Sequence, residues 1–298
     1  MLRTKPLKQI LADAEHPDHR LSRTLTVTDL IALGVGAIIG TGIFVLIGTA
    51  TVGDAVRLGA GPGITLSFLL SGLACVLAAL CYAEFAAMIP VSGSAYTYSY
   101  ATLGEFIAWI TGWILILEYG VPSVAVAIGW SGYFNKLLQI AGIYLPDWAT
   151  HAPGGPEGGV INLPAMIIVL LCTWMLVVGI NESARITTII VVIKLVVIGF
   201  FIAVGADQVD TANWSPFMPN GFAGVGAAAA IVFFAYIGFD AVSTTAEEAR
   251  NPQRDIPIGI IASLGICTLL YLAVAAILTG MIPWQKIDVN APIADALG

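Results

Sequence analysis

The sequence predicts an all-α integral membrane protein, and three observations support this fold class. Hydrophobic residues make up 58% of the 298 residues, charged residues only 10%, and the mean hydropathy is +0.91. Soluble domains carry about 25% charged residues. Apolar runs long enough to cross a bilayer as helices recur along the chain, whereas alternating strands of about ten residues do not. Because lipid offers no hydrogen-bond partners, only helices satisfy the backbone at this spacing.

Seven apolar segments are candidate membrane spans. They lie near residues 27–52, 63–89, 104–135, 160–181, 184–206, 222–247 and 256–282. We expect three parts, namely a cytoplasmic N-terminal segment (1–26), helices one to five (27–206) and helices six and seven (207–298).

The loops between these spans differ in positive charge. Eight basic residues lie on the side of the N-terminus: Arg3, Lys5, Lys8, Arg20, Arg23, Arg185, Arg250 and Arg254. Three lie on the opposite side: Arg57, Lys136 and Lys286. Cytoplasmic loops carry the excess of Lys and Arg, so we expect a plasma-membrane protein with a cytoplasmic N-terminus.

The first span contains four glycines, Gly34, Gly36, Gly40 and Gly42, in the stretch LGVGAIIGTGIFVL. The four-residue spacing of Gly36 and Gly40 suits close helix packing. Alternatively, Gly40-Thr41-Gly42 interrupts the helix and leaves N–H groups that bind an anion at the start of the next half-helix. From this segment alone both interpretations stay open.

The sixth span, GVGAAAAIVFFAYIGFDAVSTTAEE, also contains a candidate break, at Gly238 and Asp240. Paired glycine-interrupted spans indicate the midplane site of a transporter. Free N–H groups suit a carboxylate and free carbonyls suit an ammonium, and an α-amino acid has both. The simplest role for Asp240 is to cap the half-helix that follows.

Two charged residues fall inside predicted spans. Lys194 lies near the centre of the fifth span, where a charge is costly and faces a cavity or a partner. Burial lowers a lysine pKa, which suits a proton carrier; the alternative is a structural charge bonded to backbone carbonyls. Glu118, in the third span, could contribute to the substrate side-chain pocket or to a proton path, or it could form an interhelical hydrogen bond.

Other classes of protein fit the sequence poorly. Ser94, in VSGSAY, has no histidine within the membrane to activate it, and the chain lacks a phosphate-binding loop for ATP. The cysteines lack metal-ligand spacing, and there is no basic stripe for nucleic acid. We therefore expect no enzymatic activity, no metal and no nucleic-acid partner.

Three stretches resemble a known family: GVGAIIGTGIF, CYAEFAAMIPVSGSAYTYSYATLGEFIAW and FFAYIGFDAVSTTAEEARNPQRDIPIGI. They are similar to the amino acid–polyamine–organocation superfamily, most closely to bacterial proton-coupled members of its cationic amino acid transporter family. The resemblance implies a LeuT-type fold, a five-plus-five inverted repeat with discontinuous first and sixth helices. The chain ends soon after the seventh span, so we expect it to correspond to the N-terminal seven of the usual twelve helices.

The resemblance also implies a binding site at the two breaks. The substrate carboxylate would be held by backbone N–H groups within Gly40, Thr41 and Gly42. The α-amino group would be held by the carbonyls of Ile38, Phe234, Ala235 and Ile237. Lys194 matches the proton-coupling lysine of the fifth helix, and Glu118 matches an acidic position close to the site.

These residues together predict a secondary transporter that imports an L-amino acid with a proton. It would need no cofactor, because the proton is the coupling ion, and its partners would be the amino acid and the bilayer. Two alternatives remain, namely a sodium-coupled or exchange carrier and a non-transporting sensor or accessory membrane protein. The oligomeric state is left open.

Overall fold

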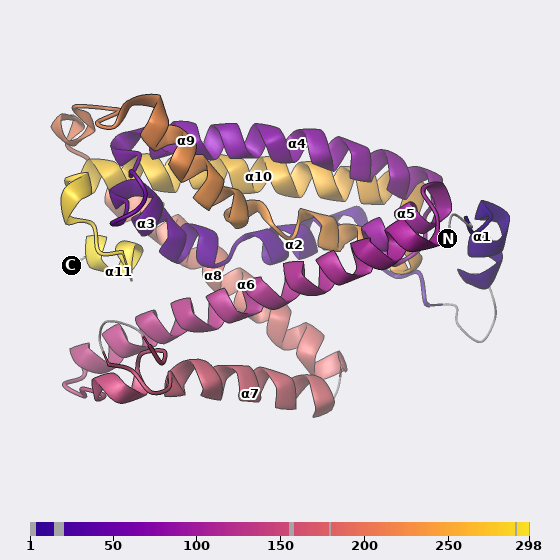
Figure 1. Ribbon diagram of the computed structural model, residues 1–298, viewed down its shortest axis with the longest axis horizontal. Coiled ribbons are helices and arrows are strands. Elements are labelled where there is room, and N and C mark those ends of the chain that lie inside the picture. Colours follow the sequence, from indigo (N-terminus) through magenta and orange to yellow (C-terminus); the bar gives the residue numbers. More distant parts are fainter. Residues whose placement is uncertain (1–3, 15–20, 155–157, 179, 290, 298) are drawn as a thin grey trace. The chain divides into compact units, whose positions relative to one another are not determined.

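The protein is all-α, as predicted from its composition. The computed structural model describes residues 4–14, 21–154, 158–178, 180–289 and 291–297 (Figure 1). The regular structure of these residues is helical, and the β-pairing within them is limited to two isolated bridges, Leu25 with Ala249 and Gly53 with Leu58. Arg3, Arg20 and the side chain of Arg185 lie outside the described part.

Every predicted span coincides with a helix or a helix pair. Five helical segments of the described chain are long and apolar enough to cross a membrane. They are Gly61–Met88 with α4 (Ile64–Met88), α6 (Glu105–Ile140), Thr188–Ala206 of α8 (Ile180–Ala206), Gly221–Glu248 and α10 (Pro252–Met281). The first predicted span is the broken pair Val27–Ile38 and Gly42–Val52, and the fourth is the shorter α7 (Leu163–Val178).

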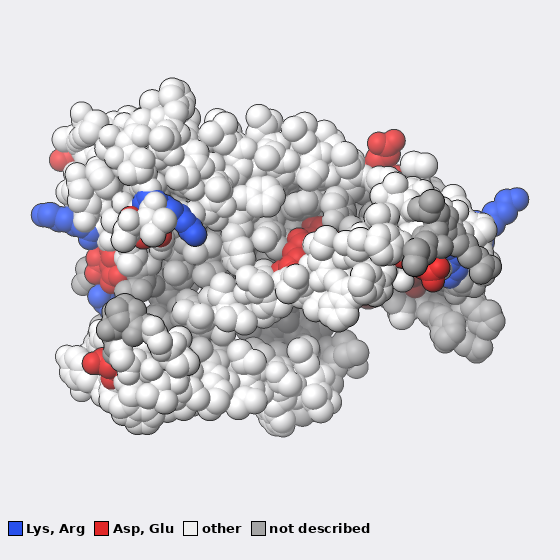
Figure 2. Space-filling model, viewed as in Figure 1, with Lys and Arg blue, Asp and Glu red and all other residues white. Residues whose placement is uncertain are grey.

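The surface agrees with a membrane environment. Large apolar side chains on α6, α7 and α8 are exposed, for example Leu117 at 64%, Trp174 at 67% and Val196 at 64%. The face in Figure 2 is mostly uncharged, with few Lys, Arg, Asp or Glu side chains. Lipid is as apolar as these side chains, so their exposure carries no penalty in a bilayer. The chain is a multi-pass membrane protein.

The chain divides into two compact units. The first contains Met1–Ile39, Phe68–Gly120 and Phe233–Tyr271, and the second contains Gly40–Ser67, Val121–Val232 and Leu272–Gly298. Each unit draws on several spans. The predicted three parts, with limits at residues 26 and 206, are not tested by this division and stay a prediction.

The first unit has an aromatic core at Phe68, Tyr236 and Tyr271. Tyr271 has its ring centroid 5.3 Å from both of the other rings, and all three side chains are fully buried. The Tyr236 hydroxyl donates to the Phe68 carbonyl at 2.9 Å. Gly72 lies beside this hydroxyl, because a Cβ there would be 2.9 Å from it. Buried hydroxyls therefore join helices α4 and α10 to the sixth span.

Helix α2 (Val27–Ile38) packs in the first unit against the 3-10 helix η6 (Phe239–Glu248). Gly34 permits this packing, because a Cβ at that position would lie 2.5 Å from Ser263 Oγ and 2.9 Å from Val242. Gly34 thus serves close helix packing. At the start of η6, Gly238 has φ +112°, and a Cβ there would be 2.9 Å from the Ala37 carbonyl oxygen.

The second unit is joined by polar contacts at the ends of its helices. In one region, the Ser67 hydroxyl donates to the Val225 carbonyl of α9 (Gly221–Val232) at 2.9 Å, and Asn220 donates to the Gly59 carbonyl at 2.8 Å. In another, Lys136 of α6 lies 3.4 Å from Asp295 in α11 (Pro292–Ala296). Lys136, which was predicted to lie outside the membrane, thus connects the last part of α6 to α11.

We expect Gly238→Ala to destabilise the protein, because the left-handed backbone disfavours a side chain by about 1–2 kcal/mol and the new Cβ would collide with Ala37. Thermal unfolding in detergent measures the effect. Gly265→Ala is the matched control, because a Cβ at Gly265 in α10 meets no atom within 4 Å. That control should be neutral or stabilising. Equal melting temperatures for the two variants would contradict the prediction.

Candidate functional site

The first span is interrupted where the glycines predict it. Helix α2 ends at Ile38, and Ile39 is extended with φ −72° and ψ 107°. The chain becomes helical again at the π-helical turn η1 (Gly42–Leu46), which leads into α3 (Ile47–Val52). The discontinuity of the first helix is thus confirmed.

In the second unit, Gly40, Thr41 and Gly42 form the start of the new helical segment. The Gly40 carbonyl accepts from the N–H groups of Ile43 at 3.3 Å and Phe44 at 3.4 Å. The first N–H groups of a helix have no acceptor within that helix. Here these are the N–H groups of Thr41 and Gly42. Thr41 is 8% exposed. Its neighbourhood therefore has the donors that an anion requires and little access to bulk solvent.

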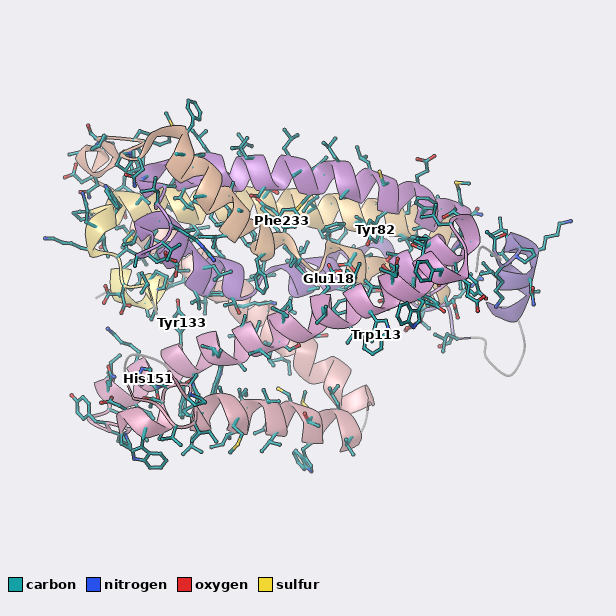
Figure 3. The ribbon with its side chains drawn as sticks, viewed as in Figure 1. Tyr82, Trp113, Glu118, Tyr133, His151 and Phe233 are labelled. Atoms are coloured by element: carbon teal, nitrogen blue, oxygen red, sulfur yellow. The ribbon has the colours of Figure 1, made fainter. Side chains whose placement is uncertain are left out.

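Helix α6 supports this segment within the second unit. The Tyr133 hydroxyl (Figure 3) donates to the Phe44 carbonyl within the π-helical turn. Gly129 allows close approach, because a Cβ there would lie 3.1 Å from Thr41 Cγ2 and 2.9 Å from Val45. Sequence reasoning missed both residues, since neither stands out within an apolar helix.

The sixth span is interrupted in the first unit. Helix α9 ends at Val232, a 3-10 turn, η5 (Phe233–Tyr236), follows, and Gly238 precedes η6. The Phe234 carbonyl accepts from the Ile237 N–H at 3.3 Å, so the turn satisfies that group itself. The discontinuity predicted for the sixth helix is confirmed.

Two of the predicted carbonyls meet at one side chain. The Tyr271 hydroxyl lies 2.9 Å from the Ile38 carbonyl and 2.9 Å from the Ala235 carbonyl. All three residues are buried, at 2% exposure or less. A tyrosine hydroxyl has one proton and can donate it to only one acceptor at a time. The pair of carbonyls thus retains acceptor capacity for a second donor, such as an ammonium.

Tyr271 was not among the predicted site residues, although a signal was available. It is a hydroxyl-bearing residue in the middle of the apolar run CTLLYLAVAA. A buried tyrosine hydroxyl normally has a hydrogen-bond partner. Few polar side chains lie in such a span, so the expected acceptor is a backbone carbonyl that has lost its partner at a helix break.

Asp240 does not cap the half-helix, so that prediction was wrong. Gly238 occupies the cap position, and the Asp240 carboxylate instead accepts a hydrogen bond from the Tyr119 hydroxyl at 2.7 Å. Asp240 is 2% exposed, and its Oδ1 has no hydrogen-bond partner within the described chain. The glycine can take the required left-handed backbone, which frees the aspartate for a contact with α6.

Glu118 neighbours this contact in the first unit. It is half-buried on α6, beside Tyr119, and interacts electrostatically with Asp240. Tyr82 of α4 interacts electrostatically with both carboxyl groups, and Figure 3 labels Tyr82 and Glu118. The unit therefore holds two acidic side chains close together among aromatic hydroxyls.

Lys194 is half-buried on α8 and belongs to the second unit, as do Gly40, Thr41 and Gly42. Ile38, Phe234, Ala235, Ile237 and Glu118 belong to the first unit. Within the first unit, the structure brings the carbonyls of Ile38 and Ala235 to Tyr271. The assigned roles in substrate binding and proton coupling stay predictions.

A comparison with known proteins decides the family. The amino acid permease family matches residues 25–298 of the chain. The chain belongs to this family. The resemblance to amino acid transporters is thereby confirmed, as is the expectation that the protein is not an enzyme.

The chain has relatives named for several different substrates. It is 50% identical over 297 residues to the methylthioribose transporter of Bacillus subtilis (strain 168), covering 100% of this chain and 63% of the relative. It is 52% identical over 297 residues to the branched-chain amino acid permease BcaP of the same organism, covering 99% of this chain and 62% of the relative. It is 43% identical over 281 residues to cationic amino acid transporter 9, chloroplastic, of Arabidopsis thaliana, covering 93% of this chain and 48% of the relative. The chain thus spans less than two thirds of these relatives' length.

We expect Tyr271→Phe to lower the free energy of unfolding by about 1–3 kcal/mol, because it leaves buried carbonyls without their donor. Thermal and denaturant unfolding in detergent measure the loss. Tyr144→Phe is the control, because Tyr144 is 76% exposed. Unfolding at the same midpoint in both variants would show that the hydroxyl does not stabilise the break.

Proposed function

We propose that the protein is part of a secondary transporter that imports an L-amino acid across the plasma membrane with a proton. The observation that carries this proposal is the convergence of the Ile38 and Ala235 carbonyls on Tyr271, next to breaks in two spans. Membership of the amino acid permease family supports the substrate class. The N-terminus would be cytoplasmic, as the distribution of Lys and Arg indicates.

In this proposal each end of the substrate binds a different kind of backbone group. The N–H groups at Thr41 and Gly42, together with Gly40, hold the carboxylate, since helix N-termini favour anions. The carbonyls of Ile38, Phe234, Ala235 and Ile237 hold the α-amino group. Backbone groups recognise the part that all α-amino acids share and leave the side chain to other residues.

Lys194 would carry the coupling proton. A lysine within an apolar span loses favourable hydration when charged, so its protonation responds to local changes in polarity. Protonation and deprotonation on opposite sides of the membrane would connect substrate movement to the pH gradient.

The acidic residues could determine substrate preference. Glu118 and Asp240 repel each other when both are charged, and a proton or a cationic side chain placed nearby would relieve that repulsion. Relief of this repulsion by a cationic side chain would place Glu118 in the side-chain pocket, and relief by a proton would place it on the proton path. Both roles are therefore supported equally.

We expect Lys194→Ala to retain substrate binding but to lose the response of uptake to pH. Uptake by the full gene product in proteoliposomes, with and without an imposed proton gradient, measures this response. Lys286→Ala is the control, because Lys286 is an exposed lysine outside the spans. Gradient-driven uptake that persists in Lys194→Ala would refute proton coupling through this residue, and a requirement for sodium would favour the alternative carrier.

We expect an α-amino acid to compete best for uptake in a panel of branched-chain, small neutral and cationic amino acids. Methylthioribose belongs in this panel because a relative named for its transport is 50% identical to the chain. That sugar lacks both an α-ammonium and a carboxylate, so inhibition by it alone would contradict the assigned backbone site. Binding without flux would instead support a sensor.

Glu118→Gln, tested in the same panel, separates the two roles of Glu118. Loss of cationic substrates alone would indicate a side-chain pocket, whereas loss of gradient-driven uptake for every substrate would indicate the proton path. Glu105→Gln, at the first residue of α6, is the matched control, because it removes a carboxylate from the same helix away from Asp240.

A further inference from the structure

A basic cavity lies in the first unit, where the N-terminal segment meets the start of α10. Its volume is about 720 Å³. Three arginines line it, Arg23, Arg250 and Arg254, and no acidic side chain is among its described lining residues. Neither the proposed substrate site nor the proton path includes these residues.

The backbone holds the arginines together. The Leu25 N–H donates to the Glu248 carbonyl and the Arg250 N–H donates to the Leu25 carbonyl, both at 3.0 Å. The Arg250 side chain donates from Nε to the Thr24 carbonyl at 3.1 Å. This bridge places Arg23 next to Arg250 although the two are far apart in sequence, so the clustered charge is built by the fold.

The N-terminus of a long helix adds to the positive potential. Helix α10 begins at Pro252, and Asn251, Pro252, Gln253 and Arg254 line the cavity. The positive end of a helix dipole favours an anion. Two acidic residues lie nearby. Asp255, in the first turn of α10, accepts from the Asn251 N–H at 3.2 Å and offsets part of this potential, and Glu247 accepts from the Ser92 N–H at 3.0 Å. Asp29 interacts electrostatically with Arg250, which leaves Arg23 and Arg254 as the charges to test.

Part of the cavity lining is apolar. It consists of Leu11, Met88 and Pro90, and Met88 is 59% exposed. Leu11 comes from α1 (Leu7–Ala14), an amphipathic helix that buries Ile10 at 5% exposure and leaves Leu7 at 41%. An arginine cluster beside an apolar wall suits a ligand that has a phosphate and an acyl chain.

We propose that this cavity binds the phosphodiester headgroup of an anionic phospholipid. The guanidinium groups of Arg23 and Arg254 would contact the phosphate, and Leu11 and Met88 would contact the glycerol and the first part of the chains. Arginine presents a planar fork of donors that matches phosphate oxygens. By the predicted orientation the lipid would belong to the cytoplasmic leaflet.

Lipid binding to the purified full gene product tests this proposal. Titrations with short-chain phosphatidylglycerol, short-chain phosphatidylcholine, glycerophosphoglycerol and inorganic phosphate are followed by thermal shift. We expect phosphatidylglycerol to bind most tightly. Removal of each arginine, by Arg23→Gln or Arg254→Gln, should weaken its binding about fivefold. Arg254→Lys, which keeps the charge but loses the planar fork, should bind phosphatidylglycerol more tightly than Arg254→Gln and less tightly than the unaltered protein.

Arg57→Gln is the matched control, because it removes an exposed arginine from the second unit and should leave lipid affinity unchanged. Equal binding of phosphatidylcholine and phosphatidylglycerol, or unchanged affinity in the Arg23→Gln/Arg254→Gln double variant, would overturn the proposal. Inorganic phosphate bound as tightly as the lipid would assign the cavity to free phosphate instead. Melting temperatures without added ligand check that each variant is folded. The measurement involves no transport, so its outcome is independent of the proposed function.

Discussion

The Tyr271 hydroxyl, shared by the carbonyls of Ile38 and Ala235, satisfies backbone groups that two broken spans would otherwise leave without partners. An interrupted helix is tolerated at membrane depth only where protein or a water-filled cavity replaces the missing hydrogen bonds. Tyr271 lies on α10, a span that is continuous through this position. A regular helix thus supports two irregular ones.

Glycines in this protein serve two different purposes. Gly34 and Gly72 give up a side chain so that Ser263, Val242 and the Tyr236 hydroxyl can approach the backbone. Gly238 adopts a left-handed conformation that other residues rarely take, and it does so against α2. Both explanations for the glycines of the first span therefore apply. Gly34 permits close packing, and Gly40-Thr41-Gly42 lies where the helix is interrupted.

Charged side chains likewise separate into distinct environments. Asp240 and Glu118 lie within spans of the first unit, where Tyr119 supplies a hydrogen bond to Asp240. Arg23, Arg250 and Arg254 gather at a loop and a helix start, where the potential attracts anions. The acidic pair is enclosed by aromatic side chains within the spans, whereas the arginines are exposed to solvent at the start of α10.

The sequence by itself determined the helical membrane class, the seven apolar segments and the two breaks. These follow from local properties, since hydropathy selects the spans and glycine marks where a helix can end. Only the tertiary structure revealed that Tyr271 joins Ile38 to Ala235, that Tyr119 rather than a helix end engages Asp240, and that Arg250 donates to the Thr24 carbonyl. Each of these contacts joins residues far apart in the chain, and the physical reason is that a hydrogen bond or a charge cluster depends on packing that no local pattern encodes.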